Sequence, residues 1–275
     1  MKKKTYILLL VVALCLLICL SSIGGGSSLF GGYTYENSKR YTAGGASISG
    51  RVNEMDISWI EGGVEVRYHD GDEIILEEEA SGKLSRKTEL HWYKDGHKLY
   101  VKYAASGSRS FKNLNKKLTV LLPENMEMDE VKISTVSADV DVQGLEGENM
   151  TFETVSGNII LNKLDADNLE IDTVSGSIRM EQARVEKLTA DSTSGDMYFA
   201  FDRNPDSVTT NAVSGNVTIS LPGDAGFRAE LDSVSGDVNC SLPAAMDGRA
   251  YVGGNGECII KADSVSGNLI LQGNN

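Results

Sequence analysis

A column of acidic side chains is the feature of this sequence best suited to binding a cation. The phrase Thr-Val-Ser-Gly-Asx, or a close variant, recurs through the second half of the chain, with an acidic or amide residue usually four positions before its glycine. In chain order these residues are Ser134, Glu153, Asp172, Asp191, Asn211, Asp232 and Asp263. Oxygen ligands of this kind are those that Ca²⁺ prefers. The column is therefore a candidate Ca²⁺ site, and the alternative is a hydrated acidic face that keeps the protein soluble.

Two cysteines outside the N-terminal apolar segment, Cys240 and Cys258, are candidates for a disulfide. Cys240 stands four residues after a repeat glycine, and Cys258 stands nine residues before the next one, both on the apolar parity of the repeats. Facing arms of adjacent repeats would bring the thiols into range, and export would permit oxidation. The other interpretation is two small buried hydrophobic residues.

The sequence contains no residue pattern typical of a catalytic site. The three histidines, His69, His91 and His97, all precede the repeats and show neither Ser-His-Asp nor zinc-ligand spacing. No glycine-rich phosphate loop is present, and the nine Lys and Arg residues after Val120 share no repeat position. We therefore predict a protein that is not an enzyme and has no catalytic or cofactor-binding residues. A surface polysaccharide-active enzyme is the most distant alternative.

The charge balance bears on partners. The 275 residues include 26 Lys and Arg against 39 Asp and Glu, a formal net charge of −13. Such an acidic chain repels phosphate backbones, so no nucleic acid partner is expected.

The repeated phrase also predicts the elements that position these residues. Measured at its glycine, the seven copies are spaced by 19, 19, 19, 20, 21 and 31 residues. Apolar residues alternate on both sides of the phrase, but their parity changes across it, so two strands must meet at a sharp bend. Glycine supplies the positive φ or the close backbone approach that such a bend needs. The six predicted bend glycines, after Ala138 in the first copy, are Gly157, Gly176, Gly195, Gly215, Gly236 and Gly267.

One such coil cannot bury its own apolar face, so the coils must stack. We predict an all-β fold, a single-stranded β-solenoid of about seven coils of 19–21 residues over residues 124–275. In this stack, successive repeats would place the acidic column at strand spacing, about 4.8 Å from coil to coil.

The N-terminal half divides into three expected segments. Residues 1–23 combine Lys2, Lys3 and Lys4 with an apolar run, which indicates either a cleaved signal peptide or a retained transmembrane helix. Residues 24–46 resemble a flexible Gly/Ser-rich tether. Residues 47–123 show irregular strand patterns, which predict either a β region capping the stack or a separate small domain. In each case the β region is exported, and it is membrane-anchored or secreted.

An N-terminal membrane segment, the run Leu-Thr-Val-Leu-Leu-Pro (residues 118–123) and the stacked phrases together resemble the bacterial putative-adhesin family of β-strand-repeat proteins, a domain of unknown function with LiaG-like members. The resemblance implies a β-solenoid outside the membrane and carries no catalytic residues. We expect a structural or interaction module at a bacterial cell surface. It would contact the membrane through its N-terminal helix and bind an envelope polymer, a glycan or another surface protein. The alternative is an accessory protein in envelope-stress signalling.

Overall fold

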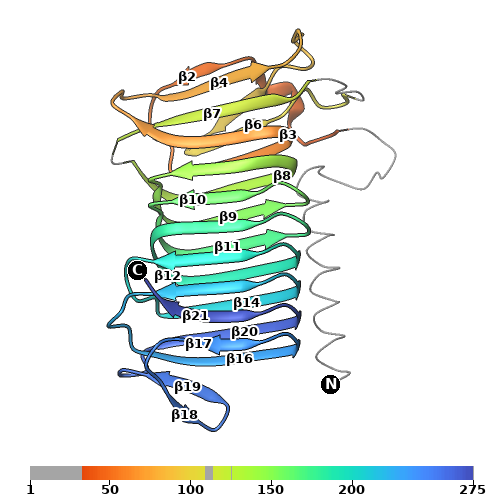
Figure 1. The fold of residues 1–275 in the computed structure, drawn as a ribbon. Coiled ribbons are helices and arrows are strands. Elements are labelled where there is room, and N and C mark those ends of the chain that lie inside the picture. Colours follow the sequence, from red (N-terminus) through yellow and green to blue (C-terminus); the bar gives the residue numbers. More distant parts are fainter. Residues whose placement is uncertain (1–32, 109–113, 125, 275) are drawn as a thin grey trace.

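The computed structural model describes residues 33–108, 114–124 and 126–274, and the fold is reported for these residues. They are all-β apart from one 3₁₀ turn, η1 (Ser38–Arg40), and wind into a stack of coils (Figure 1). The all-β class expected from the sequence is confirmed. The N-terminal segment expected at residues 1–23 lies outside the described residues. Within the described residues, no helix has the length and apolar character needed to cross a membrane.

Each coil has two arms that meet at the repeated phrase. In one coil, β9 (Glu146–Thr154) is the first arm and β10 (Ile159–Asn162) is the second. The next coil consists of β11 (Asp165–Thr173) and the first residues of β12 (Ile178–Ser194). These coils pair in parallel with a 19-residue offset, which sets Ile171 against Phe152 and Ile178 against Ile159. The sequence period is therefore the length of one coil.

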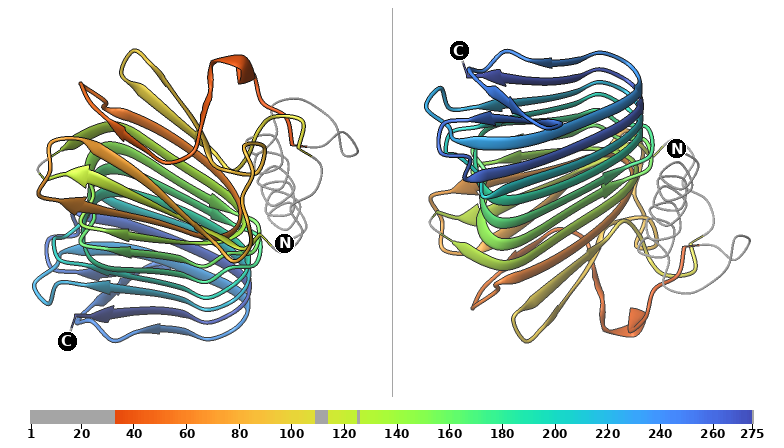
Figure 2. Two further views of the ribbon diagram at one scale, coloured as in Figure 1. Left: turned by 90° about the horizontal axis from the view of Figure 1, so that it is seen from above. Right: turned by 90° about the horizontal axis from the view of Figure 1, so that it is seen from below.

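The same pairing extends through the middle of the stack. Above β9 and β10 lies β8 (Glu127–Gln143), which contains both arms of the first repeat. Below β12 lie β13 (Met197–Phe201), β14 (Ser207–Ser214) and β15 (Val217–Leu221). In both views of Figure 2, the coils follow one another as a single stack. The residue two positions after the bend residue is 1% exposed or less in each of these five coils, from Val140 to Val217. These stacked side chains therefore belong to the hydrophobic core.

Two further coils come from the N-terminal region. β3 (Glu54–His69) runs parallel to β8 on one side. On its other side it runs parallel to β6 (Lys98–Lys102) and β7 (Lys116–Pro123), which together form the outermost coil. The described chain therefore forms nine coils: the seven predicted over residues 124–275 and these two, which were not predicted.

This end of the stack is also capped. β4 (Ile74–Ala80) pairs antiparallel with β7, and β5 (His91–Asp95) pairs antiparallel with β6. β2 (Ala46–Ile48) and β1 (Thr42–Ala43) extend this cover along β4 and β5. Leu99 and Leu118 of the outermost coil are consequently 0% exposed. The region expected to cap the stack thus supplies both its first coils and their cover.

The C-terminal end departs from chain order. The last repeat, β20 (Cys258–Ser266) and β21 (Leu269–Gly273), lies between the fifth repeat and the sixth, which consists of β16 (Phe227–Ser235) and β17 (Val238–Cys240). The C-terminus accordingly lies beside the stack and not at its end (Figure 1). The expected order of successive repeats is wrong at this end of the stack. The 31-residue gap holds a hairpin, β18 (Ala245–Asp247) and β19 (Ala250–Gly253), that folds back onto β16 and lets the chain re-enter the stack.

Candidate functional site

The six repeat glycines lie at the bends, where neighbouring backbones approach closely. A Cβ atom on Gly157 would lie 1.9 Å from the carbonyl oxygen of Ala138, and one on Gly176 would lie 1.8 Å from that of Gly157. The same crowding recurs at Gly195, Gly215, Gly267 and Gly236, in their order along the stack. Of these six, only Gly215 has a φ in the positive range, at 135°. Close approach is therefore the common reason for glycine at the bends.

Other residues of the phrase form hydrogen bonds with the backbone at the bend. The Gly157 N–H donates to Thr154 Oγ1 at 2.9 Å, and the Gly176 N–H donates to Thr173 Oγ1 at the same distance. Asp139 Oδ1 accepts from the Asn158 N–H at 2.8 Å, which links consecutive coils. Since these groups serve the fold, the repeated Ser-Gly-Asx phrase acts as a structural bend.

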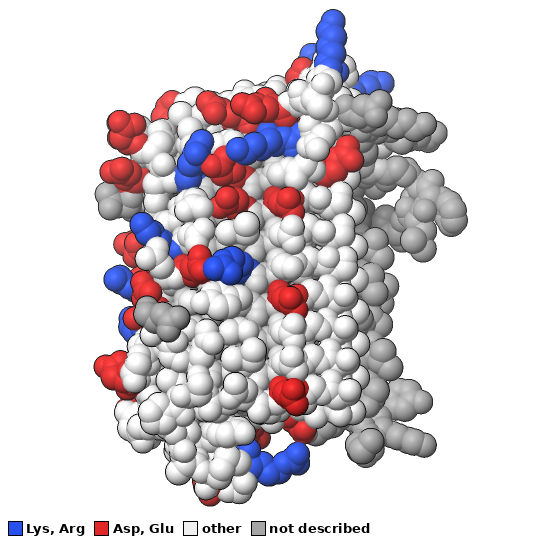
Figure 3. All heavy atoms as spheres, in the orientation of Figure 1, with Lys and Arg blue, Asp and Glu red and all other residues white. Residues whose placement is uncertain are grey.

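The acidic column is present in the structure, and three of its carboxylates, those of Glu153, Asp191 and Asp232, are paired with neighbouring side chains. Asp172 lies in register between Glu153 and Asp191. At the C-terminal end the order is Asn211, Asp263, Asp232, because of the inserted last repeat. Figure 3 shows that acidic side chains recur along the length of the stack on one face.

Each of these three carboxylates has an identified partner. Glu153 accepts from Lys132 Nζ at 2.8 Å and from Ser134 Oγ at 2.9 Å. Asp191 accepts from Asn211 Nδ2 at 2.7 Å, yet burial still raises its pKa. Asp232 pairs with Arg249 at 3.6 Å. Among the described residues, no group of three or more His, Cys, Asp or Glu is arranged to hold a metal ion.

The two cysteines, for which the sequence left open a disulfide or two small hydrophobic residues, are free thiols in the structure. They lie on different arms: Cys258 is in register with Phe227 of β16, whereas Cys240 is in register with Leu271 of β21. Cys258 is 0% exposed, and burial raises the pKa of its thiol to about 12. Cys258 therefore behaves as a small core residue.

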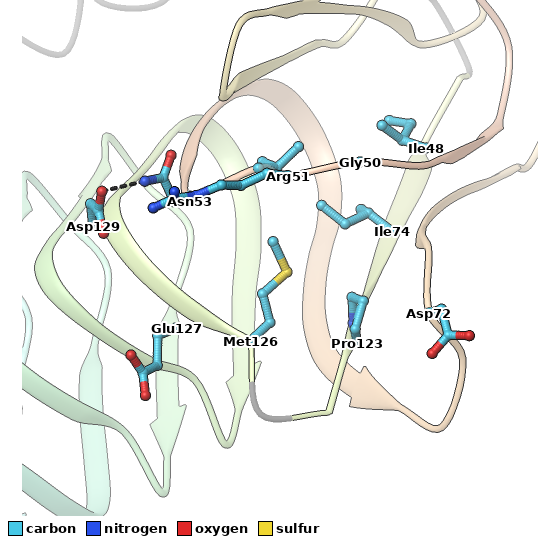
Figure 4. A pocket seen from close by; sticks show the side chains of 11 residues that line it. Ile48, Gly50, Arg51, Asn53, Asp72, Ile74, Pro123, Met126, Glu127 and Asp129 are labelled. Atoms are coloured by element: carbon cyan, nitrogen blue, oxygen red, sulfur yellow. Dashed lines mark hydrogen bonds between the residues drawn. The ribbon is translucent and has the colours of Figure 1, made fainter.

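A recess in the N-terminal cap is the structure's best candidate for a ligand site (Figure 4). It encloses about 420 Å³, within the usual range for small-molecule sites. Apolar side chains and polar side chains both line it. The apolar residues are Ile48, Val52, Ile74, Pro123 and Met126, and the polar or charged ones are Arg51, Asn53, Asp72, Glu127 and Asp129.

The polar side of the recess is organised by Asn53. Its main-chain carbonyl accepts from the Asp129 N–H at 2.7 Å, and its side-chain Nδ2 donates to Asp129 Oδ2. Its Oδ1 is buried and has no hydrogen-bond partner among the described residues. A ligand hydroxyl or amine entering the recess would find the carboxylates of Asp72, Glu127 and Asp129. Sequence reasoning missed the recess because its residues come from three separate loops and strands.

A buried ion pair was also missed. Lys116 is 0% exposed, and its Nζ lies 2.5 Å from Glu78 Oε1 and donates to Thr88 O at 2.7 Å. The same ammonium lies 4.0 Å from the Tyr103 ring centroid and 4.8 Å from that of Trp59. Burial lowers the pKa of Lys116. The signal was present, since Lys116 shares the inward parity of Leu118 and Val120 on β7.

The parallel coils and their in-register columns define a repeat protein of the β-solenoid class. The chain belongs to the Toastrack DUF4097 family, whose model matches residues 52–197 and 94–272. This match confirms the resemblance drawn from the repeats. No curated protein matches the chain.

Several solved structures are similar to this chain. One is described as a putative cell adhesion protein from Clostridium sporogenes, with 13% identity, coverage of 85% of this chain and 100% of that chain, and a TM-score of 0.39. Another is a putative adhesin from Bacteroides fragilis, with 11% identity, coverage of 85% and 97%, and a TM-score of 0.46. A third is a putative adhesin from Parabacteroides distasonis, with 13% identity, coverage of 84% and 96%, and a TM-score of 0.45.

Proposed function

We propose that this protein is a non-enzymatic interaction module on the outer side of a bacterial cell membrane. The observation that carries this proposal is the recess of the N-terminal cap, which is lined by both apolar side chains and polar or charged ones. In the middle of the stack, the groups of the repeated phrase and of the acidic column are instead engaged with one another. The family assignment is consistent with this proposal and names no reaction.

The chemistry of the recess favours a sugar unit of an envelope polymer or glycan. Sugar hydroxyls donate to carboxylates such as those of Asp72 and Asp129. The C–H face of a sugar ring would pack on Ile48, Ile74 and Met126, leaving Arg51 to contact an acidic or acceptor substituent.

Binding of purified glycans and envelope polymers to the full chain tests this proposal. Arg51 and Asp72 are exposed, so Arg51→Ala and Asp72→Ala should leave the fold intact. Each loses a charged hydrogen bond worth roughly 1.5–3 kcal/mol, so we expect affinity to fall by about tenfold or more. Asp167→Ala, an exposed acidic residue outside the recess, should leave affinity unchanged. Equal losses in all three variants, or no binding by the wild type, would contradict the proposal.

The proposed location rests on the N-terminal sequence, where three lysines precede an apolar run. Protease added to intact cells should digest the β region, whereas a cytoplasmic control protein should survive. Protection of the β region until the cells are lysed would contradict an extracytoplasmic position.

A further inference from the structure

The two ends of the stack are finished differently. At the N-terminal end, antiparallel strands cover both arms of the outermost coil. At the C-terminal end, β19 covers only residues 227–230 of β16. Beyond them, residues 231–240 pair with β20 and β21 on their inner side and with no strand of the described chain on their outer side. We call residues 231–240 the open edge; it holds the end of β16, the bend at Gly236 and β17.

The core columns are also uncovered at this end. Val238 and Cys240 are half-buried, whereas the equivalent residues one coil further in, Leu269 and Leu271, are 1% and 0% exposed. Val234, beside the bend, is 63% exposed. An edge that offers both backbone groups and apolar side chains is a template for pairing with another strand.

We propose that the open edge binds the open edge of a second copy of this chain, end to end around a two-fold axis through the bend. β16 runs toward Gly236 and β17 runs away from it, so the axis lays β17 of one copy antiparallel along β16 of the other. The open edge has five residues before the bend, 231–235, and four after it, 237–240, so its two sides differ in length by one residue. The core-facing sides of the two copies lie on the same side of the interface. The half-buried side chains of Val238 and Cys240 are then covered by the other copy.

The charges at this end predict how such a dimer responds to salt. Asp237 is exposed and adjoins the bend, so the two copies of this carboxylate would lie close together at the axis. Their repulsion is screened by salt, and we therefore expect dimerisation to strengthen as ionic strength rises. Asp237→Asn should strengthen it at low salt.

Cysteine cross-linking of the full chain tests the geometry. Asp237→Cys places a thiol beside the axis, near its own copy in the partner. Asp196→Cys is the matched control, since Asp196 is also exposed and also follows a bend glycine, but lies in a coil with neighbours on both sides. With the native cysteines retained, oxidation should give covalent dimers of Asp237→Cys well above the level of Asp196→Cys. Equal levels in the two variants would overturn the proposal.

The mass of the full chain in solution gives a second test. Ser233 and Ser235 have register partners in β20 but Val234 between them has none, so the Val234 N–H is the donor that we assign to a strand on the outer side. Val234→Pro removes that donor, whereas Val234→Thr keeps it. We expect the wild type and Val234→Thr to reach twice the monomer mass as concentration rises, and Val234→Pro to stay monomeric with an unchanged melting temperature. A wild type that stays monomeric would mean that something other than a second copy covers this edge, and would refute the proposal.

Discussion

At the residue scale, the stack rests on side chains whose environment repeats from coil to coil. The hydroxyl and Asx groups of the repeated phrase bond to the bend backbone, as Thr154 does to Gly157. Two single residues depart from this regularity, and each is expected to lower the stability of the folded protein. Asp191 is a half-buried carboxylate, and Lys163 adopts a left-handed backbone conformation.

Asp191→Asn is expected to stabilise the protein at neutral pH. Burial raises the pKa of Asp191 above its ordinary value of 3.8, so the folded state holds this proton at pH values where the unfolded chain has lost it. Wild-type stability therefore falls as pH rises through the window above 3.8, and the amide removes that fall. Asn can still accept the hydrogen bond from Asn211 Nδ2. Melting curves should show the variant to be more stable at pH 7, by a margin that shrinks toward pH 4; a constant margin would contradict this cause.

Lys163→Gly is expected to stabilise the protein by up to about 1 kcal/mol, because a left-handed conformation is costly for residues with a Cβ. Lys163 has a φ of 55°, and the equivalent residue one coil earlier is Gly144, with a φ of 75°. Chemical denaturation should measure the gain. As a control, Asn162→Gly on the adjacent strand residue should destabilise by roughly 0.5–1 kcal/mol. A loss of stability in Lys163→Gly would refute the argument.

At the element scale, the bend between the two arms decides how closely the coils stack. Each bend glycine faces the carbonyl oxygen of the neighbouring coil, as Gly176 faces Gly157, so crowding at one bend is transmitted along the stack. The arms themselves follow from alternating apolar residues, which local sequence shows clearly. The bend was predictable for the same reason, since the apolar parity changes across each phrase.

Gly176→Ala is expected to destabilise the protein by about 2–3 kcal/mol, since the added methyl group would lie 1.8 Å from the Gly157 carbonyl oxygen and must force the backbones apart. Gly223→Ala is the control, because a Cβ there meets no atom within 4 Å. It should change the free energy of unfolding by less than about 1 kcal/mol. Similar denaturation midpoints for the two variants would contradict the role given to the bend.

The acidic column likewise belongs to the element scale, since it runs along the first arms. Glu153 bonds to Lys132 and Asp191 bonds to Asn211. We therefore expect the same melting temperature in excess calcium as in the presence of a chelator. A calcium-dependent rise that Asp172→Asn abolishes would show instead that these carboxylates bind the ion.

At the scale of the whole molecule, the sequence predicted the repeated coils but not the full order in which the coils stack. The 19-residue period shows which residues align, as Asp172 does with Glu153, but not where a strand beyond a long gap returns. The position of β20 depends on the hairpin β18–β19 and on pairing between distant segments, which no local pattern records. The two extra coils were hidden for a similar reason, since β3, β6 and β7 lack the repeated phrase. The recess of the cap, which joins separate loops, could not be predicted at all.

The order of coils at the C-terminal end determines which strands form the open edge and which residues end the acidic column. Thr209 of β14 and Glu230 of β16 each lie in register with Lys261 of β20, on opposite sides of it. Thr209 is thus one strand spacing from Lys261 and two spacings, about 9.6 Å, from Glu230.

Paired cysteine substitutions in the full chain, followed by oxidation and mass analysis, test this order directly. We predict that Thr209→Cys with Lys261→Cys forms an intramolecular disulfide, and that Thr209→Cys with Glu230→Cys does not, because the latter pair exceeds the roughly 7 Å limit between bridged Cα atoms. The reverse result, a disulfide between positions 209 and 230 with none between 209 and 261, would show that the repeats stack in chain order.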